Sequence, residues 1–427
     1  MYLFNFYHLK QLGNMNHLMQ TLGFGSEDRN NGVSYKKYLL KKQIIEIFYK
    51  EGNKTIPKLC EITNNSVPNI TNLLGELSND GWICSFGMGH SKGGRKPTLY
   101  GINTNIGYIL GIDLSRQYTR MCIFNLHNNY IGEILELNEG LSNSGNILTF
   151  LKESVDKLLN TNNIQIEQIL GIGIAIPGFI DIRKGVSYSY PQLGDKPLKE
   201  TFEDILNRPV FIEHDTRTIA LGEKWFGLAK NITDVLFLNI GSGIGLSMIL
   251  NGNLFRGHSG FSGEFGHIQM DPEGELCYCG KVGCLETVAS GTAIVKRSKE
   301  IILKGKNTLI SKITDNNPEK IKLKTIIDAA NLGDQFAIEL LEEASEYLSK
   351  GISILIHLFN PEAIIIGGEM AYADSLIKDP IQQKISKYTI TLMKQDTQIL
   401  VSQLKGEAAL LGTLPVVMSK LFSEEFS

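Results

Sequence analysis

The sequence lacks any run of about 20 uninterrupted apolar residues, the length that a membrane-spanning helix needs. Its first twenty residues are interrupted by polar side chains and so do not form the apolar core of an export signal. Cysteine is also scarce, with six residues in a chain of 427, too few for the disulfide framework of a secreted protein. These absences predict a cytoplasmic protein that has no membrane partner.

The sequence also has little net charge, because 42 Lys and Arg oppose 45 Asp and Glu. The charge is unevenly placed, however. The first 100 residues hold 12 basic against 7 acidic side chains, whereas the remainder holds 30 against 38. Binding to a polyanion depends on where charge is placed rather than on the total. The N-terminal region is therefore a candidate for nucleic-acid binding, although surface charge also fluctuates along chains that bind none.

The length and the 42% hydrophobic content suffice for two or three compact cores. We expect a flexible lead-in over residues 1–35, because this segment ends in the polar run Gly25 to Gly32. A DNA-binding domain is expected over residues 36–102. An α/β domain is expected over residues 103–427.

The segment from residue 36 to residue 79 has the pattern of a helix-turn-helix. Apolar residues recur at helical spacing from Tyr38 to Tyr49, and Thr55 is placed to cap a second, short helix. Asn64 and Asn65 then predict a tight turn. Ser66 is expected to cap a third helix that runs to about Asn79.

The third helix is expected to bury its leucines and to present a polar N-terminal face to base edges in the major groove. A strand over residues 81–85 follows, and the basic, glycine-rich segment from Gly87 to Pro97 is expected to form a hairpin tip, or wing, that reaches a minor groove or phosphates. An alternative interpretation is a three-helix module used for protein contacts. The candidate DNA-binding residues are Ser66, Asn69, Thr71, Asn72, Lys92, Arg95 and Lys96.

After Asn103 the pattern changes to strands that alternate with helices, which indicates an α/β fold with ligands at strand ends. The stretch from Val235 to Leu250 begins the strand pattern again, so two related lobes with a cleft between them are expected. The expected strands are Tyr108 to Asp113, Thr119 to Asn125, Tyr130 to Leu137, Ile169 to Ile176, Val210 to Ile212, Val235 to Ile240 and Ala363 to Ile366.

Four potential metal ligands, His267, Cys277, Cys279 and Cys284, lie close together in a glycine-rich loop. Three thiolates and one imidazole can complete a tetrahedral shell around Zn²⁺, which leaves no position for water. The site is therefore expected to be structural and to stabilise the loop over residues 264–286. The alternative is a set of free, buried cysteines.

The chain resembles the ROK (repressor, open reading frame, kinase) proteins, and among them the repressors of xylose, glucose and N-acetylglucosamine operons. The resemblance covers roughly Lys36 to Ser419. It rests on several motifs taken together: Gly94-Arg95-Lys96-Pro97, Asp113, Glu213-His214-Asp215 before Ala220 to Glu223, Gly241 to Gly245, Gly263 to His267, and Cys277 to Glu286.

This resemblance implies a two-lobed, actin-like ATPase (ribonuclease H-like) sugar-kinase fold. It also implies a monosaccharide site, because carboxylates and an imidazole bind hydroxyl groups through directional hydrogen bonds. In kinase members the residue matching Asp215 is the general base. Simpler roles are open for three of the residues concerned. Asp215 is also placed to cap a helix, Glu264 to form a salt bridge, and Glu286 to act as an acidic residue in the first turn of a helix. The implied sugar-binding residues are His214, Asp215, Glu264, His267 and Glu286.

Two departures from the kinase pattern argue against phosphoryl transfer. Kinase members carry a glycine pair and a threonine after the first-strand aspartate, where this chain has side chains from Ser115 to Tyr118. His214 replaces the asparagine that usually precedes the catalytic aspartate. Gly241 to Gly245 and Gly367-Gly368 partly retain the other nucleotide loops, so weak nucleotide binding stays open, although we do not expect ATP as a cofactor.

The predicted function is a non-enzymatic repressor of carbohydrate-utilisation genes that binds double-stranded operator DNA and responds to a sugar or sugar phosphate. A homodimer or dimer of dimers is expected, with subunit contacts in the helix-rich segment from Lys324 to Leu358. One alternative is an active ATP-dependent hexokinase with an accessory DNA-binding module. Another is a regulator whose signal is a transport protein rather than a sugar.

Overall fold

The protein is described by a computed structural model that covers residues 32–88, 96–143, 145–181, 185–190, 193 and 196–422. Its contacts divide the chain into two compact units. Unit 1 consists of Met1–Ile174, Lys199–Ile212 and Val416–Ser427, and unit 2 of Ala175–Leu198 and Glu213–Pro415. Within the covered residues, no helix combines the length and the apolar character that crossing a membrane requires.

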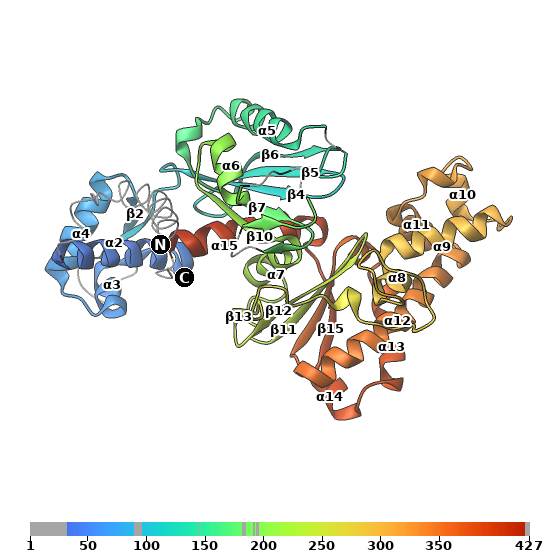
Figure 1. Ribbon diagram of the computed structural model, residues 1–427. Helices are drawn as coiled ribbons and strands as arrows, with labels where there is room; N and C mark the ends of the chain where they lie inside the picture. The colour runs from blue at the N-terminus through green and yellow to red at the C-terminus, as the bar shows by residue number, and fades with distance from the viewer. Residues whose placement is uncertain are drawn as a thin grey trace, which may run out of the picture. The chain divides into compact units, whose positions relative to one another are not determined.

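The described part of unit 1 begins with three helices and a small sheet, an arrangement compatible with a helix-turn-helix (Figure 1). The strand order in the sheet is β1-β3-β2. The first helix starts earlier than predicted, so residues 32–35, expected in the flexible lead-in, are helical; the rest of that lead-in lies outside the described residues. The elements are α2 (Gly32–Glu51), β1 (Lys54–Thr55), α3 (Ile56–Thr63), α4 (Val67–Asn79), β2 (Ile83–Met88) and β3 (Thr98–Ile102).

The turn between α3 and α4 follows from local sequence. Asn64 adopts a left-handed conformation with φ of 51°, which asparagine tolerates better than most residues, and ends α3. Ser66 is the N-cap of α4 as predicted, although its side chain makes no capping hydrogen bond. A proline in the first turn fixes the start of α4. The helix then buries Ile70, Leu73, Leu74 and Leu77.

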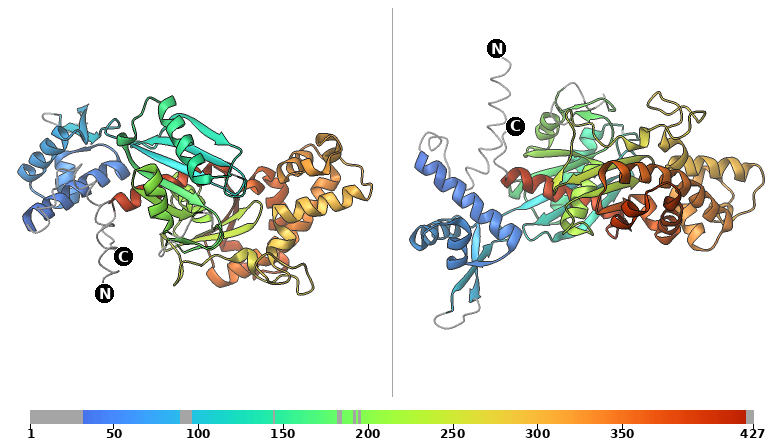
Figure 2. Two further views of the ribbon diagram at one scale, coloured as in Figure 1. Left: turned by 45° about the horizontal axis from the view of Figure 1, so that its top comes forward. Right: turned by 90° about the horizontal axis from the view of Figure 1, so that it is seen from below.

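The predicted hairpin after α4 is present. Ile83 pairs with Ile102 and Ser85 with Tyr100 in an antiparallel ladder that reaches Met88. Figure 2 shows β2 and β3 extending away from the three helices. The expected tip of the wing, residues 89–95, lies outside the described residues.

The rest of unit 1 is built on a five-stranded sheet of order β10-β7-β4-β5-β6. The three strands along its antiparallel part coincide with the predicted segments almost residue for residue, and α5 packs against β5. The elements are β4 (Tyr108–Leu114), β5 (Thr119–Asn125), β6 (Tyr130–Leu137), α5 (Ile147–Thr161), β7 (Ile169–Ile176), α6 (Leu198–Leu206) and β10 (Val210–His214).

Unit 2 contains a second five-stranded sheet, of order β13-β12-β11-β14-β15. If the five strands of each sheet are numbered one to five along the chain, both sheets have the same spatial order, 3-2-1-4-5, read from β6 in the first sheet and from β13 in the second. This shared order confirms the predicted duplication of the α/β pattern. The strands are β11 (Val235–Ile240), β12 (Ile244–Leu250), β13 (Asn253–Leu254), β14 (Ala363–Gly367) and β15 (Gln398–Val401). A separate short ladder is formed by β8 (Ile180–Asp181) and β9 (Val186–Ser187).

Alternating side chains of β11 serve two cores, because successive residues of a strand point to opposite faces. Leu236 and Leu238 join a large cluster with the long helix α12, whereas Val235 and Phe237 pack with Ala220 of α7. The sheet of unit 2 is thus covered on both faces. The helices of this unit are α7 (Asp215–Phe226), α8 (Leu285–Ala289), α9 (Gly291–Leu303), α10 (Leu309–Ile313), α11 (Leu323–Asn331), α12 (Gln335–Phe359), α13 (Ser375–Lys384) and α14 (Thr391–Asp396), and α15 (Ala408–Phe422) continues into unit 1.

Candidate metal centre and ligand site

The four predicted metal ligands come together in a compact loop. His267 ends the short 3₁₀ helix Phe265–His267, and Cys284 precedes α8. Between them the chain turns back on itself, with the Cys277 amide donating to the Lys281 carbonyl at 2.7 Å. Gly283 is required at its position: its φ is 74°, and an added Cβ would lie 1.5 Å from the Asp271 carbonyl oxygen.

The ligand atoms are close enough together to surround one metal ion. All four lie within 4.8 Å of one another. The Cys279 and Cys284 sulfurs are 3.7 Å apart, and the Cys277 sulfur is 3.6 Å from His267 Nδ1. Ligands bound to Zn²⁺ at about 2.3 Å (S) and about 2.0–2.1 Å (N) would be about 3.8 Å (S to S) and about 3.6 Å (N to S) apart. These residues therefore fit zinc, and the sulfurs are too far apart for a disulfide.

The thiols would not ionise together without a cation. Burial, with hydrogen bonds from the neighbouring cysteines, raises the pKa of Cys284 to about 12. Burial also raises the pKa of Cys277. For Cys279, burial opposes ionisation but is outweighed by hydrogen bonds, the first from the Lys281 amide, so that its pKa is lowered. A divalent cation among the three sulfurs would stabilise all three thiolates.

His267 is held between the metal ligands and the remaining candidate residues. Its Nδ1 faces Cys277, while its Nε2 lies 3.3 Å from the Tyr278 hydroxyl and 3.9 Å from Glu264 Oε2. The imidazole stacks on Phe179 at a centroid distance of 6.0 Å, and the Tyr278 ring meets it edge-on at 5.3 Å. With Nδ1 directed at a metal, Nε2 is the nitrogen left to donate to a ligand.

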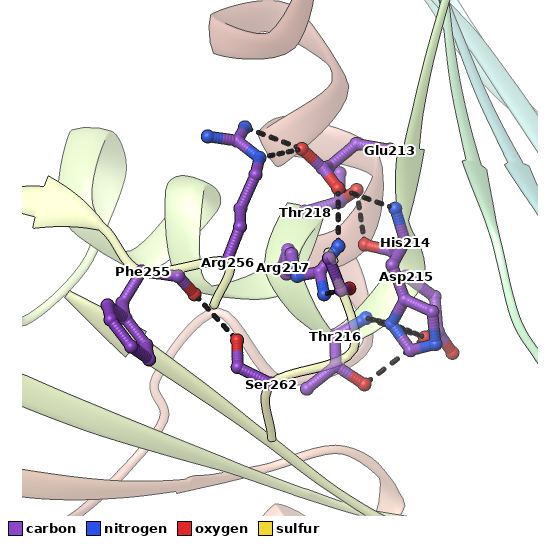
Figure 3. A network of polar contacts seen from close by, with 10 residues as sticks. Glu213, His214, Asp215, Thr216, Arg217, Thr218, Phe255, Arg256 and Ser262 are labelled. Carbon is purple, nitrogen blue, oxygen red and sulfur yellow. Dashed lines mark hydrogen bonds and ion pairs between the residues drawn. The ribbon is translucent and has the colours of Figure 1, made fainter. Parts of the chain in front are cut away.

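Asp215 is the first residue of α7, directly after His214 at the N-cap (Figure 3). The Thr216 amide donates to Asp215 Oδ1 at 2.6 Å and more distantly, at 3.3 Å, to His214 Nδ1. The N-cap position belongs to His214, whereas Asp215, for which capping was the simpler role considered, contacts the amide of the next residue within the first turn. The Asp215 side chain is still one-quarter exposed, so it can also accept a ligand.

The predicted sugar-binding residues gather around the start of β12. Glu286 Oε2 accepts from the Ile244 amide at 3.1 Å. A Cβ added at Gly245 would lie 2.5 Å from Thr216 Oγ1, so α7 approaches the strand closely beside Asp215. Gly263, which precedes Glu264, pairs with Leu246 through its carbonyl, which accepts from the Leu246 amide at 3.2 Å. Three segments distant in sequence thus contact one short stretch of backbone.

The segment at the kinase phosphate-loop position is a closed turn in unit 1. The Ser115 amide donates to the Tyr118 carbonyl at 3.0 Å. The Ser115 and Arg116 carbonyls accept from the amides of Leu141 and Ser142, at 3.0 and 2.8 Å. The Ser115 amide, one group that could face a phosphate in an open loop, is therefore already used.

The polar face of α4 is exposed as predicted. Ser66, Asn69, Thr71 and Asn72 are all exposed, while the apolar face of the helix is buried. Asn69 donates through Nδ2 to Asn65 Oδ1 at 2.9 Å, which orders the side chain at the start of the helix. Of the predicted wing residues Lys92, Arg95 and Lys96, only the last is described, and it is exposed.

Phe179 and Tyr278 are site residues that the sequence analysis missed. Phe179 follows the Pro177-Gly178 end of strand β7, and Tyr278 lies between two metal ligands. Their positions next to recognised motifs were the available signals. Neither residue carries a charge at neutral pH, and neither belongs to the Cys, His and carboxylate types that selected the other candidates.

A module compatible with a helix-turn-helix, followed by duplicated sheets of actin-like topology, defines a class: DNA-binding proteins built on a sugar-kinase fold. Solved structures support this assignment. A ROK family transcriptional regulator, homolog of E. coli MLC protein, matches with a TM-score of 0.75 and 26% identity over 91% of this chain and 97% of its own. A ROK family glucokinase from Streptomyces griseus, in complex with glucose and AMPPNP, matches with a TM-score of 0.64 and 28% identity over 72% of this chain and 98% of its own.

The sequence comparisons identify the family. The xylose repressor of Caldicellulosiruptor bescii is 31% identical over 395 residues, which cover 91% of this chain and 96% of that protein. Residues 109–420 match the ROK family model, and the chain belongs to the ROK family.

Proposed function

We propose that this protein is a transcriptional repressor that binds operator DNA through its N-terminal module and releases or tightens that binding when a monosaccharide or sugar phosphate occupies unit 2. One observation carries the proposal: the same chain presents an exposed polar recognition face on α4 and gathers His214, Asp215, Glu264, His267 and Glu286 around β12. The match to the C. bescii xylose repressor over nearly its whole length supports it.

Sugar recognition would use both hydrogen-bond acceptors and a hydrogen-bond donor, because the site combines the two. The carboxylates of Asp215 and Glu264 accept hydrogen bonds from hydroxyl groups, whereas His267 Nε2 donates one when Nδ1 faces the metal. Glu286 accepts from the Ile244 amide, which holds its carboxylate at the start of β12 beside the other candidate residues. A ring with adjacent hydroxyl groups is the ligand that such a set of groups suits best.

His267, Cys277, Cys279 and Cys284 would hold a structural zinc ion. When bound, zinc supplies a fixed junction between the loop and the start of α8 and leaves no open coordination position. His267 differs from the cysteines in having a second polar atom, Nε2, which lies beside the Tyr278 hydroxyl while Nδ1 faces Cys277. Loss of metal is thus expected to weaken sugar binding indirectly, through the orientation of His267.

We propose a sensor rather than a kinase, because Ser115 to Tyr118 form a closed turn and His214 replaces the asparagine of kinase members. The alternative is an active ATP-dependent sugar kinase, which the glucokinase match favours. A coupled ADP-release assay with D-xylose, D-glucose and N-acetylglucosamine separates the two. Turnover that disappears in Asp215→Asn would establish the kinase alternative.

Dimerisation would let two recognition helices read a two-fold operator. The proposed subunit surface lies at the end of α12, where Ile354 and Leu358 are exposed apolar residues. Ile390 and Leu392 of the neighbouring segment are also exposed, and the Ile390 amide donates to His357 at 3.3 Å. Exposed apolar side chains that adjoin one another are typical of an interface.

The test begins with duplexes selected from a random pool by the purified full chain. Binding to the best duplex is then titrated with the three sugars and their phosphate esters, in the wild type and in Glu264→Ala. A change in DNA affinity with one sugar in the wild type, absent in the variant, supports the proposal. DNA affinity that no sugar changes would assign the signal to another molecule, such as a transport protein.

A further inference from the structure

Glu213 is a buried carboxylate that the sugar site, as described, does not use. Its side chain is 4% exposed and lies at the end of β10, two residues before Asp215. It accepts from the His214 amide at 3.0 Å, from Arg217 at 3.3 Å and from Arg256 at 2.7 and 3.3 Å (Figure 3). A buried carboxylate persists only with such partners, because removing charge from water is costly.

The two arginines connect Glu213 to a loop between β13 and Glu264. Arg256 is the second residue of this loop, and Arg217 of α7 donates to the Gly260 carbonyl further along it. Inside the loop, Ser262 donates from its hydroxyl to the Phe255 carbonyl at 3.0 Å. The loop leads directly into Glu264 and His267.

The loop contains three glycines with positive φ and few backbone hydrogen bonds of its own, among them one from the Ser262 amide to the Arg256 carbonyl at 3.3 Å. Its glycines at 257, 260 and 263 have φ of 71°, 88° and 96°, conformations that glycine alone adopts freely. Glycine also has the largest freedom to lose when a segment becomes ordered. The contacts of Arg256 with Glu213, and of Arg217 with the Gly260 carbonyl, therefore add order to a segment that is costly to order.

We propose that Glu213, with Arg217 and Arg256, is a positioning unit that fixes Asp215 on one side and Glu264–His267 on the other in a single geometry. This inference rests on the proposed sugar site and deepens it. None of the three side chains needs to touch the sugar. Burial opposes ionisation of Glu213, but the charges of Arg256 and Arg217 outweigh it, so the pKa of Glu213 is lowered and the carboxylate stays charged near neutrality.

Arg256 is the side chain to change, because it is 46% exposed and its removal threatens folding less than that of Glu213. Arg256→Ala breaks the link to the loop, and Arg256→Lys keeps the charge without the two-pronged contact. Arg297→Ala is the matched control, since Arg297 pairs on the surface of the same unit with Glu343 at 3.7 Å.

Hydrogen exchange of the full chain tests the proposal without any sugar. In Arg256→Ala, amide exchange should accelerate in residues 257–267 and also at residues 214–217, with partial recovery in Arg256→Lys and no change in Arg297→Ala. Zinc content and circular dichroism should match the wild type. Acceleration confined to residues 255–262, or none, would overturn the proposal.

Calorimetry with D-xylose, D-glucose and N-acetylglucosamine adds the functional readout. For a sugar that the wild type binds, Arg256→Ala should weaken affinity about 10-fold or more, because misplaced groups lose most of their effect. The double variant with Glu213→Gln should be no weaker than the worse single variant. Affinity within twofold of the wild type would contradict the positioning role. If the wild type binds none of these sugars while exchange changes at both segments, the proposed function fails and the positioning role stands.

Discussion

Replacing Gly283 with alanine should damage the metal loop far more than the same change at Gly280, and the two glycines form a matched pair. Both lie in the loop between Cys277 and Cys284, and both have positive φ, 74° and 88°. A Cβ at Gly280 meets no atom within 4 Å, whereas at Gly283 it would lie 1.5 Å from the Asp271 carbonyl oxygen. The comparison therefore separates the cost of a Cβ at positive φ, which both variants have, from the cost of a clash with neighbouring atoms, which only the Gly283 variant has.

The expected magnitudes differ accordingly. Gly280→Ala introduces only the steric strain between a Cβ and the backbone at positive φ, which costs about 1–2 kcal/mol. Gly283→Ala pays that cost and must also move the backbone at Asp271, for which overpacking adds about 1–3 kcal/mol. The Gly283 carbonyl also accepts from the Met270 and Asp271 amides, at 2.7 and 3.1 Å, so a shift there disturbs the metal ligands on both sides.

Thermal unfolding of the zinc-loaded proteins and zinc release to a colorimetric chelator measure the two effects. Gly283→Ala should have the lower midpoint and release zinc faster, while Gly280→Ala should retain zinc like the wild type. Equal midpoints and equal release rates in the two variants would refute the claim that close packing against Asp271 makes Gly283 necessary.

Three further predictions concern the sugar site, acid stability and DNA. Tyr278→Phe should strengthen sugar binding about 2–10-fold by calorimetry, because the hydroxyl beside His267 Nε2 competes with the sugar; weaker binding would mean that the hydroxyl contacts the sugar instead. The folded-state pKa of Glu213 is lowered, so its ion pairs with Arg256 stabilise the protein above the unfolded pKa and are lost as pH falls through the folded pKa. Chemical denaturation at descending pH should show this loss in the wild type, and a parallel loss in Glu213→Gln would exclude it. Asn69→Ala should relax base preference in duplex selection, with a cost of about 1–3 kcal/mol at one base pair; an unchanged selected sequence would remove Asn69 from the recognition surface.

Much of the fold could be predicted from periodicity. Strands such as Thr119–Asn125 and Val235–Ile240 are short apolar runs bounded by polar turns, and their limits coincide with the predicted ones. The third helix was equally clear, because Ser66, Pro68 and the spacing of its leucines specify start and buried face together. These elements could be predicted because their limits are set by residues next to them in the sequence. The start of α2 was placed too late, since polar residues before it do not prevent helix formation.

The cluster of four candidate metal ligands could be predicted because its members are close in sequence and chemically distinctive, while zinc binding itself stays a prediction. The Glu213 contacts could not, because Arg256 lies 43 residues away and its approach depends on how β10 and the loop after β13 pack. The stacking of Phe179 on His267 is a longer-range example of the same kind. Chemistry in a sequence identifies candidates, while the geometry that unites them depends on tertiary packing.

Thermodynamic linkage between sugar and DNA tests the central claim most directly. If one sugar changes DNA affinity by some factor, DNA must change the affinity for that sugar by the same factor. Calorimetry with the effective sugar, performed on the free protein and on the protein saturated with its selected duplex, should give two dissociation constants whose ratio equals the shift in DNA affinity. Identical dissociation constants in the two titrations would contradict a sugar-responsive repressor.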